Sequence, residues 1–389
     1  MAAPKRPWRW MLRPGFTALI GAVVRIVVLG VLLAHNPRLW SLNEAAGIAR
    51  QLVLGHGFST PYHDATGPTA WLAPVYPSML AGIFHIFGIE SIASAWAIVI
   101  LNIVFAFFTT LVIFKLANDC FGKRAAIIAA WVWAISPTTV IAPWFIWETS
   151  LSAQLVSYAF WRLLLLKRDF PTREWIFCGL ILGFAALLNP ALMAVLVPVA
   201  VVIGWRDRSV GKLCVLFLVC ALCIVPWTIR NRIEMGSFVP MRSNFWPEAY
   251  FGNVTFDAHP SMSSMLYQRE GEMGFVRDLR SQVIEYVRQN PGAFVRRTLN
   301  RIYDFWTQPR RYLEIPSLLF LGSLAGLLQA WRSGREWLCF ACVLAFYPLV
   351  YYVTYTFSRY RHPIEPVMCI LTGYAVAELA GWIGWPSRA

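Results

Sequence analysis

A few charged side chains stand out in this largely apolar sequence because together they could act on a phosphate-bearing substrate. Glu44 and Glu148 are carboxylates beside apolar segments, where partial burial would raise the pKa of the acid towards that of a useful general base. Arg230, Arg359 and Arg361 carry guanidinium groups that can each bind phosphate through two N–H groups. These residue types predict proton transfer next to a bound phosphate.

The same residues also have structural interpretations that the sequence leaves open. Glu44 ends the capping-box pattern Ser41-Leu42-Asn43-Glu44, in which its carboxylate would accept a hydrogen bond from the backbone N–H of Ser41. Glu148 at the start of a helix would be favoured by the helix dipole. Arginines at helix ends can simply bind lipid headgroups. We expect that headgroup role for four arginines of amphipathic loop segments, Arg242, Arg296, Arg297 and Arg301.

A metal site is a further hypothesis. His63 and Asp64 are adjacent in a predicted loop and could join Glu44 as ligands of a divalent ion or contact the acceptor, although adjacency is weak evidence for ligation. His362 follows Arg361 and is expected to assist phosphate binding. The sequence therefore leaves metal dependence open and indicates no organic cofactor.

One charge is predicted to lie inside the membrane. Arg25 is in the middle of the first apolar segment, and Glu378 in the last one could form an ion pair with it. The eight cysteines lie in apolar segments or in loops predicted to be cytoplasmic, so no structural disulfide is expected. The two C-x-x-C pairs, Cys220/Cys223 and Cys339/Cys342, are interpreted as packing residues.

The elements that must position these residues are membrane helices. The 389 residues are 58% hydrophobic and 14% charged, contain 19 tryptophans, and have a mean hydropathy of +0.54, which excludes an ordinary soluble protein. The net charge of +14 comes largely from Lys and Arg in short segments between apolar runs. That distribution favours contacts with lipid headgroups over nucleic acid.

The apolar segments predict an all-α polytopic protein with about ten transmembrane helices, each able to cross a hydrocarbon core of about 30 Å. Alternate threading puts most of the basic connecting segments, and the N-terminus, on the cytoplasmic side. The first segment is expected to be an uncleaved anchor rather than a signal peptide. The predicted spans are residues 16–34, 92–114, 125–143, 146–166, 175–189, 191–205, 213–229, 314–331, 337–357 and 365–384.

Two long outer loops, residues 35–91 and 230–313, are expected within a single domain of residues 1–389. Each contains apolar residues at helical spacing, which predicts short amphipathic helices lying flat in the outer membrane interface. The first loop would hold one helix that ends near Gly55 and a second from Pro77 to Gly88. The second loop would hold stripes formed by Val276, Leu279, Val283 and Val287, and by Val295, Leu299, Ile302 and Trp306.

Several motifs, taken in order along the chain, resemble the bacterial C-type (GT-C) glycosyltransferases of family 39. The resemblance implies a membrane enzyme that transfers a sugar from a polyprenyl-phosphate donor to an acceptor at the outer face, with a carboxylate of the first outer loop as base. Asn43-Glu44 departs from the Asp-Glu pair of that family. The motifs are Asn43-Glu44-Ala45-Ala46, Gly55-His56-Gly57-Phe58, Thr66-Gly67-Pro68-Thr69-Ala70-Trp71-Leu72-Ala73-Pro74-Val75-Tyr76-Pro77, Ile146-Trp147-Glu148-Thr149, Pro226-Trp227-Thr228-Ile229-Arg230-Asn231, Asn244-Phe245-Trp246, Gly252-Asn253 and Arg359-Tyr360-Arg361-His362-Pro363-Ile364-Glu365-Pro366.

The resemblance assigns Glu44 as base, Glu148 as a supporting acid and Arg230, Arg359, Arg361 and His362 as donor-phosphate ligands. A bacterial inner-membrane location follows, with a hexose or pentose as the transferred group and a lipid, glycan or protein as acceptor. A transporter or lipid flippase is the alternative, although the sequence has no evident internal repeat. A non-catalytic scaffold of a cell-envelope assembly remains a third hypothesis.

Overall fold

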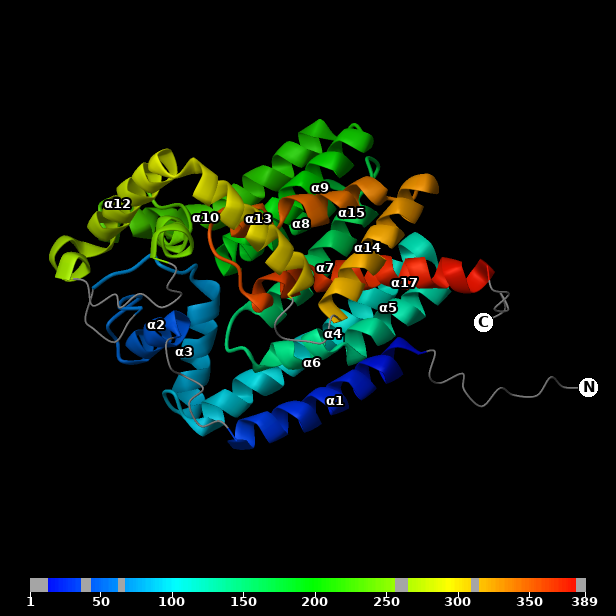
Figure 1. The fold of residues 1–389 in the computed structure, drawn as a ribbon, viewed down its shortest axis with the longest axis horizontal. Coiled ribbons are helices and arrows are strands. Elements are labelled where there is room, and N and C mark those ends of the chain that lie inside the picture. Colours follow the sequence, from blue (N-terminus) through cyan, green and yellow to red (C-terminus); the bar gives the residue numbers. More distant parts are fainter. Residues whose placement is uncertain (1–12, 36–42, 62–66, 256–264, 309–314, 383–389) are drawn as a thin grey trace, which may run out of the picture.

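The computed structural model describes residues 13–35, 43–61, 67–255, 265–308 and 315–382. These ranges are helical apart from connecting turns and one isolated bridge between Ser59 and Pro68. Figure 1 shows two regions. A bundle of long helices forms most of the molecule, and α2 (Glu44–Val53), α3 (Val75–Phe87) and α12 (Met265–Gln289) gather at one end of it.

Every predicted apolar segment coincides with a helix or a pair of helices. By length and composition four of the described helical stretches could cross a membrane, and one bent pair could be a fifth. The all-helical membrane architecture is thus confirmed, whereas the number of ten spans stays a prediction. The bundle consists of α1 (Pro14–His35), α4 (Ile92–Phe121), α5 (Lys123–Ile135), α6 (Pro137–Ile141), α7 (Thr149–Leu165), α8 (Thr172–Leu188), α9 (Met193–Arg206), α10 (Val210–Met235), α14 (Ile315–Arg332), α15 (Trp337–Phe346), α16 (Leu349–Val353) and α17 (Glu365–Trp382).

Two of the predicted spans are interrupted at prolines. The segment 125–143 breaks between α5 and α6, and the two parts are bent by 54°. Ser136 precedes Pro137 and is extended, with φ −60° and ψ 130°, because the proline ring disfavours helical backbone in the residue before it. The segment 337–357 is divided at Tyr347 and Pro348, between α15 and α16, but both residues keep helical backbone angles there.

Arg25 stabilises the first of these breaks. Its buried guanidinium donates to the backbone carbonyls of Trp133 at 3.0 Å, Ala134 at 3.3 Å and Thr139 at 3.3 Å. The carbonyls of Trp133 and Ala134 lie in the last turn of α5, where a helix leaves acceptors without partners, and that of Thr139 lies in α6. The predicted ion pair with Glu378 is wrong, because Glu378 is exposed and Arg25 is committed to the helix break.

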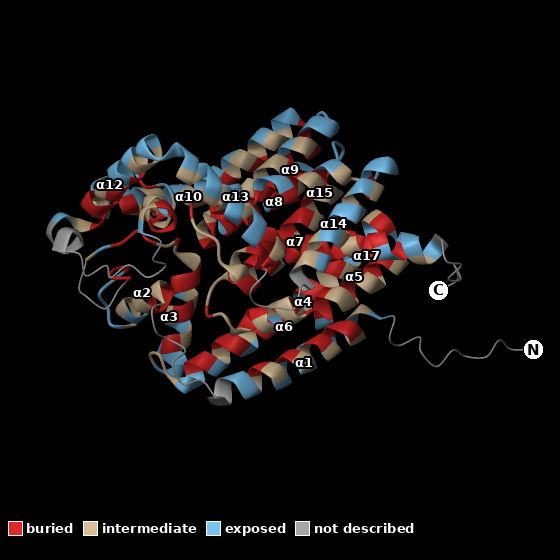
Figure 2. Ribbon diagram, in the orientation of Figure 1, coloured by how far each residue is buried: buried red, intermediate tan, exposed pale blue. Residues whose placement is uncertain are grey.

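The bundle core is formed by close helix packing around α4, α5, α7 and α17, whose inward faces are buried in Figure 2. Small residues allow the closest approach. A Cβ atom on Gly373 of α17 would lie 2.7 Å from the backbone nitrogen of Ala129 in α5, so a larger residue does not fit there. The face of α1 that points away from the bundle exposes Ile26 and Val27, as expected of a lipid-facing surface.

The outer helices pack differently from the prediction of flat interfacial helices. In α12 the stripe of Val276, Leu279 and Val283 is buried, and Leu279 packs with Phe275 against Trp71 of the first loop. The stripe of α12 therefore joins the two loops instead of facing lipid. In α13 (Pro291–Thr307), Val295 and Leu299 remain exposed, so interfacial contact stays a prediction for this helix.

Candidate active site

The beginning of α2 is held against the beginning of α7. Asn43 is the N-cap of α2: its side-chain oxygen accepts from the backbone N–H of Ala46 at 3.0 Å. The side-chain amide of Asn43 also donates to the carbonyl of Ile146 at 2.6 Å. Because Glu44 is the first residue of α2, it is not the closing residue of the predicted capping box. Ser41 lies outside the described residues.

Glu44 is a half-buried acid in an electrostatically crowded place. Its pKa is raised to about 7, chiefly by burial. The charges of Glu248 and Glu148 raise this pKa further, while the guanidinium of Arg359 lowers it. Glu44 is thereby poised between its protonated and ionised forms near neutral pH, the condition in which a carboxylate serves best as a general base.

Glu148 contributes a second carboxylate from the N-cap position of α7. Its side chain caps no backbone N–H of that helix. It accepts instead from the side-chain amide of Asn189 at 3.1 Å, and Asn189 also caps the turn that follows α8 by accepting from the N–H of Ala191. The structure thus brings Glu148 and Glu44 together, as the sequence predicted, and orients Glu148 through α8.

Glu248 and Arg242 complete the charged cluster and were missed as site residues. Glu248 lies in α11 (Phe245–Tyr250), and its pKa is raised by burial and lowered by Arg242 and Arg359. The predicted headgroup role of Arg242 is wrong, because this arginine lies beside the carboxylates of the cluster. The nearby motif Asn244-Phe245-Trp246 was a signal for this segment, but it did not point to the charged residues on either side.

Arg359 is the cation of the cluster that is held by aromatic rings. Its guanidinium lies 4.4 Å from the ring centroid of Phe357, 4.8 Å from that of Trp147 and 5.2 Å from that of Tyr360. Among the described residues it forms no hydrogen bond and no ion pair, and its side chain is half-buried. Aromatic contacts fix the plane of the guanidinium and leave its N–H groups available for an anion.

Arg361 and His362, two residues further on, are engaged elsewhere. Arg361 is fully buried, pairs with Glu365 at 3.0 Å and donates to the carbonyl of Trp306 at 2.8 Å. His362 contacts the other oxygen of Glu365 at 2.8 Å and stacks on Trp133. The expectation that Arg361 and His362 contact donor phosphate is therefore corrected: they fix the turn Ser358–Ile364 (η5), which carries Arg359.

Arg230 is also occupied, and it acts between the outer loops. Its guanidinium donates to the carbonyls of Thr69 at 2.5 Å and Phe58 at 2.6 Å. The same stretch is held by buried Glu272 of α12, which accepts from the N–H of Ala70 at 3.0 Å, from the hydroxyl of Ser243 at 2.6 Å and from the hydroxyl of Thr69. In place of the predicted phosphate contact, Arg230 helps to hold the two loops together.

Two more arginines turn out to be internal. Arg301 is buried and donates to the carbonyl of Tyr352 at 3.1 Å and to the side-chain oxygen of Asn253 at 3.0 Å, while Arg297 donates to the carbonyl of Asn253. The headgroup prediction is wrong for both, because they join α13 to η4 (Phe251–Thr255) and α16. Arg296 is exposed, and for it the headgroup role stays a prediction.

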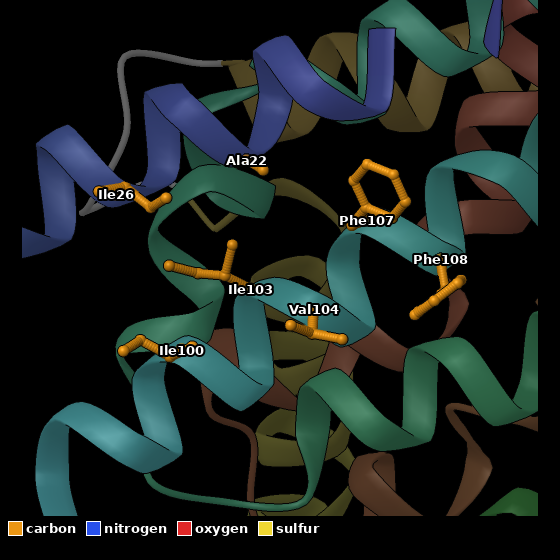
Figure 3. A pocket seen from close by; sticks show the side chains of 7 residues that line it. All are labelled: Ala22, Ile26, Ile100, Ile103, Val104, Phe107 and Phe108. Atoms are coloured by element: carbon orange, nitrogen blue, oxygen red, sulfur yellow. The ribbon is translucent and has the colours of Figure 1, made fainter. Parts of the chain in front are cut away.

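Two further candidate sites are the predicted metal site and a cavity in the helix bundle. His63 and Asp64 lie outside the described residues, and the part of the chain that is described contains no cluster of three His, Cys, Asp or Glu side chains arranged to hold a metal. A cavity of about 380 Å³ between α1 and α4 (Figure 3) is lined only by apolar side chains, among them Ile26, Ile103 and Phe107. It lacks any group for acid–base chemistry.

Comparisons with known proteins give a family match for part of the chain and similar folds. Residues 71–229 match the family described as dolichyl-phosphate-mannose-protein mannosyltransferase. Comparison with curated proteins gave no match. No observation from these comparisons supports the transporter alternative.

Solved structures give the fold. The archaeal oligosaccharyltransferase AglB from Archaeoglobus fulgidus, in complex with an inhibitory peptide and a dolichol-phosphate, is 16% identical with a TM-score of 0.59, covering 97% of this chain and 51% of its own. ArnT from Cupriavidus metallidurans in the apo state is 17% identical with a TM-score of 0.54, covering 92% of this chain and 61% of its own. This chain thus spans about half to three fifths of these proteins. The predicted resemblance is confirmed: the chain is a multi-pass membrane protein with the GT-C glycosyltransferase fold, and its residues 71–229 match the dolichyl-phosphate-mannose-protein mannosyltransferase family.

Proposed function

We propose that the protein is a membrane glycosyltransferase that moves a hexose or pentose from a polyprenyl-phosphate donor to an acceptor at the extracytoplasmic face. The observation that carries the proposal is the shared site of Glu44 and Arg359. A carboxylic acid with a pKa of about 7 lies near a guanidinium that no carboxylate pairs with directly in the described structure. The fold and the matched family, named for a dolichyl-phosphate sugar donor, support this reading.

The site fits a displacement at the anomeric carbon. Glu44 would take the proton of an acceptor hydroxyl or amide as that atom attacks the sugar carbon C1. The bond between C1 and the phosphate oxygen breaks, and polyprenyl phosphate leaves with one more negative charge. Arg359 and Arg242 would stabilise that charge in the transition state. Attack from the side opposite the leaving phosphate inverts the configuration at C1.

The carboxylates of Glu248 and Glu148 share one task in this scheme. Glu248 and Glu148 raise the pKa of Glu44 and so keep the base from ionising at too low a pH. We propose that the site is on the outer side of a bacterial inner membrane, with the N-terminus in the cytoplasm. Alternate threading of the predicted spans supports this, because it puts most of the basic connecting segments on the opposite side from both site-forming loops. The acceptor could be a lipid, a glycan or a protein.

The test is mass spectrometry of the lipids that co-purify with the protein and with its Glu44→Gln and Arg359→Ala variants. We expect Glu44→Gln to accumulate a sugar-bearing polyprenyl phosphate, because binding remains while transfer stops. We expect Arg359→Ala to lose this lipid. Glu285→Gln and Arg288→Ala remove exposed charges of α12 and serve as matched controls. If wild type and all variants carry bulk phospholipid only, the transferase proposal fails.

A further inference from the structure

One buried hydroxyl in the site has no partner in the described structure. Tyr76, at the start of α3, is 2% exposed, yet its phenolic O–H makes no hydrogen bond within the part of the chain that is described. An unsatisfied buried hydroxyl costs about 1–3 kcal/mol, so such groups normally have a partner that is a ligand or an ordered water. α3 packs against α8, whose C-cap Asn189 donates to Glu148. Burial raises the pKa of Tyr76, and the charge of Glu148 raises it further.

The start of α7 offers a second unpartnered group, directly after Glu148 in the chain. The hydroxyl of Thr149, which is 5% exposed, also has no hydrogen-bond partner among the described residues. One oxygen of Glu148 accepts from Asn189, and the other accepts no hydrogen bond from the residues that the structure describes. Within the described residues, the start of α7 and Tyr76 therefore supply a phenol, a hydroxyl and a carboxylate oxygen that have no hydrogen-bond partner.

The chemistry of these groups selects a neutral ligand with several hydroxyls. An anion would be repelled by the Glu148 carboxylate, and an apolar group would leave all three polar atoms unsatisfied. A sugar ring can donate to the carboxylate oxygen and accept from the phenol and the threonine hydroxyl at once. Resting on the proposed function, we infer that Tyr76, Glu148 and Thr149 form the subsite that binds the hydroxyl groups of the donor sugar, whereas Arg359 serves its phosphate.

The experiment compares lipids that differ only in the sugar. Undecaprenyl phosphate, free or bearing glucose, mannose or arabinose, is titrated against the full-length protein in nanodiscs, and binding is read by native mass spectrometry. Wild type should bind at least one sugar-bearing lipid more tightly than the sugar-free lipid. Tyr76→Phe and Thr149→Val, which remove hydroxyls but keep shape, should each weaken that lipid about fivefold and change sugar-free binding less than twofold.

The matched control is Tyr158→Phe, which removes a hydroxyl further along α7 and should leave the affinity for every lipid unchanged. Equal affinity of the two variants and wild type for every lipid would mean that water alone satisfies these hydroxyls, and it would overturn the subsite. Equal weakening of free and sugar-bearing lipids would overturn it as well, since the groups would then not read the sugar. A wild type that binds none of the lipids, even the sugar-free one, would instead refute the proposed function.

Discussion

The side-chain amide of Asn43 donates to the backbone carbonyl of Ile146 at 2.6 Å. Asn43 directly precedes Glu44, and Ile146 lies two residues before Glu148. This hydrogen bond joins two segments more than a hundred residues apart in the sequence and brings the two carboxylates into one site. The same asparagine caps α2 through its side-chain oxygen. Position 43 thus supplies a donor and an acceptor at once, which an aspartate in its ionised form cannot do.

Replacing Asn43 separates these two roles. Asn43→Ala should lower stability by about 1 kcal/mol through loss of the cap and should also lower activity. Asn43→Asp keeps the cap acceptor but loses the donor to Ile146, so stability should fall less than in the alanine variant while activity still falls. Thermal unfolding and donor turnover measure the two effects. Full activity in both variants would show that the contact does not position Glu44.

The pH dependence of turnover should follow Glu44. Because its pKa is about 7 and the base acts when ionised, kcat/KM should rise as pH increases through 7 and then level off. Glu248→Gln removes a charge that raises this pKa and should move the rise to lower pH, whereas Arg359→Ala removes a charge that lowers it and should move any residual rise to higher pH. A wild-type profile that is flat from pH 5 to 9 would exclude Glu44 as the base.

The same pKa has a sign for stability. An acid whose pKa is raised on folding stabilises the folded state at low pH, and this contribution is lost as pH rises from the unfolded value towards about 7. Glu44→Gln should therefore raise the melting temperature at pH 8 and leave it nearly unchanged at pH 4. Melting curves in one detergent across this range test it. A variant less stable than wild type at pH 8 would contradict the raised pKa.

Arg359 and Arg361 should behave oppositely when replaced by alanine. Arg361→Ala leaves Glu365 buried without its guanidinium partner, which should cost about 3–5 kcal/mol and lower the melting temperature strongly. Arg359→Ala removes only aromatic contacts and should cost less than about 2 kcal/mol, yet abolish donor binding. If Arg361→Ala were stable and failed only in donor binding, Arg361 would be a phosphate ligand after all.

Removing the guanidinium of Arg25 should destabilise the fold without involving Glu378. Arg25→Met removes a donor from three backbone carbonyls at the helix break, of which Trp133 still accepts from the hydroxyl of Thr139. The carbonyls of Ala134 and Thr139 lose their arginine donor, at a cost of about 1–3 kcal/mol for each unsatisfied group. Glu378→Gln should unfold like wild type, since Glu378 is exposed. If Arg25→Met and Glu378→Gln lowered the melting temperature by comparable amounts, the result would support the ion pair between Arg25 and Glu378.

Glu272 should govern how firmly the outer loops are joined. Glu272→Ala leaves the N–H of Ala70 and the hydroxyl of Ser243 without their acceptor, so hydrogen exchange should quicken at residues 67–71 and 243–250 and turnover should fall. Glu272→Gln keeps one oxygen as an acceptor and should have a smaller effect. Exchange that stays as slow as in wild type would show that Arg230 alone holds the loops.

Local sequence patterns were sufficient for much of this protein. Long apolar segments predict membrane helices because lipid requires every backbone group to be hydrogen-bonded within the segment, and all of the predicted segments are helical. The sequence also singled out Glu44 as a carboxylate beside an apolar segment, and burial raises the pKa of this acid. Its catalytic role stays a prediction. The ordered motifs likewise indicated the GT-C fold.

Only the tertiary structure decided which charges meet. Arg359 and Arg361 are two residues apart in η5, yet one faces the carboxylate cluster and the other is buried against Glu365, since neighbouring side chains of a tight turn point in different directions. Arg25 donates to Trp133, Arg230 to Thr69, and Glu272 accepts from Ala70, and each of these partners is more than a hundred residues away in the chain. Electrostatic and hydrogen-bonding partners depend on which distant segments pack together, and a local sequence pattern carries no information about that packing.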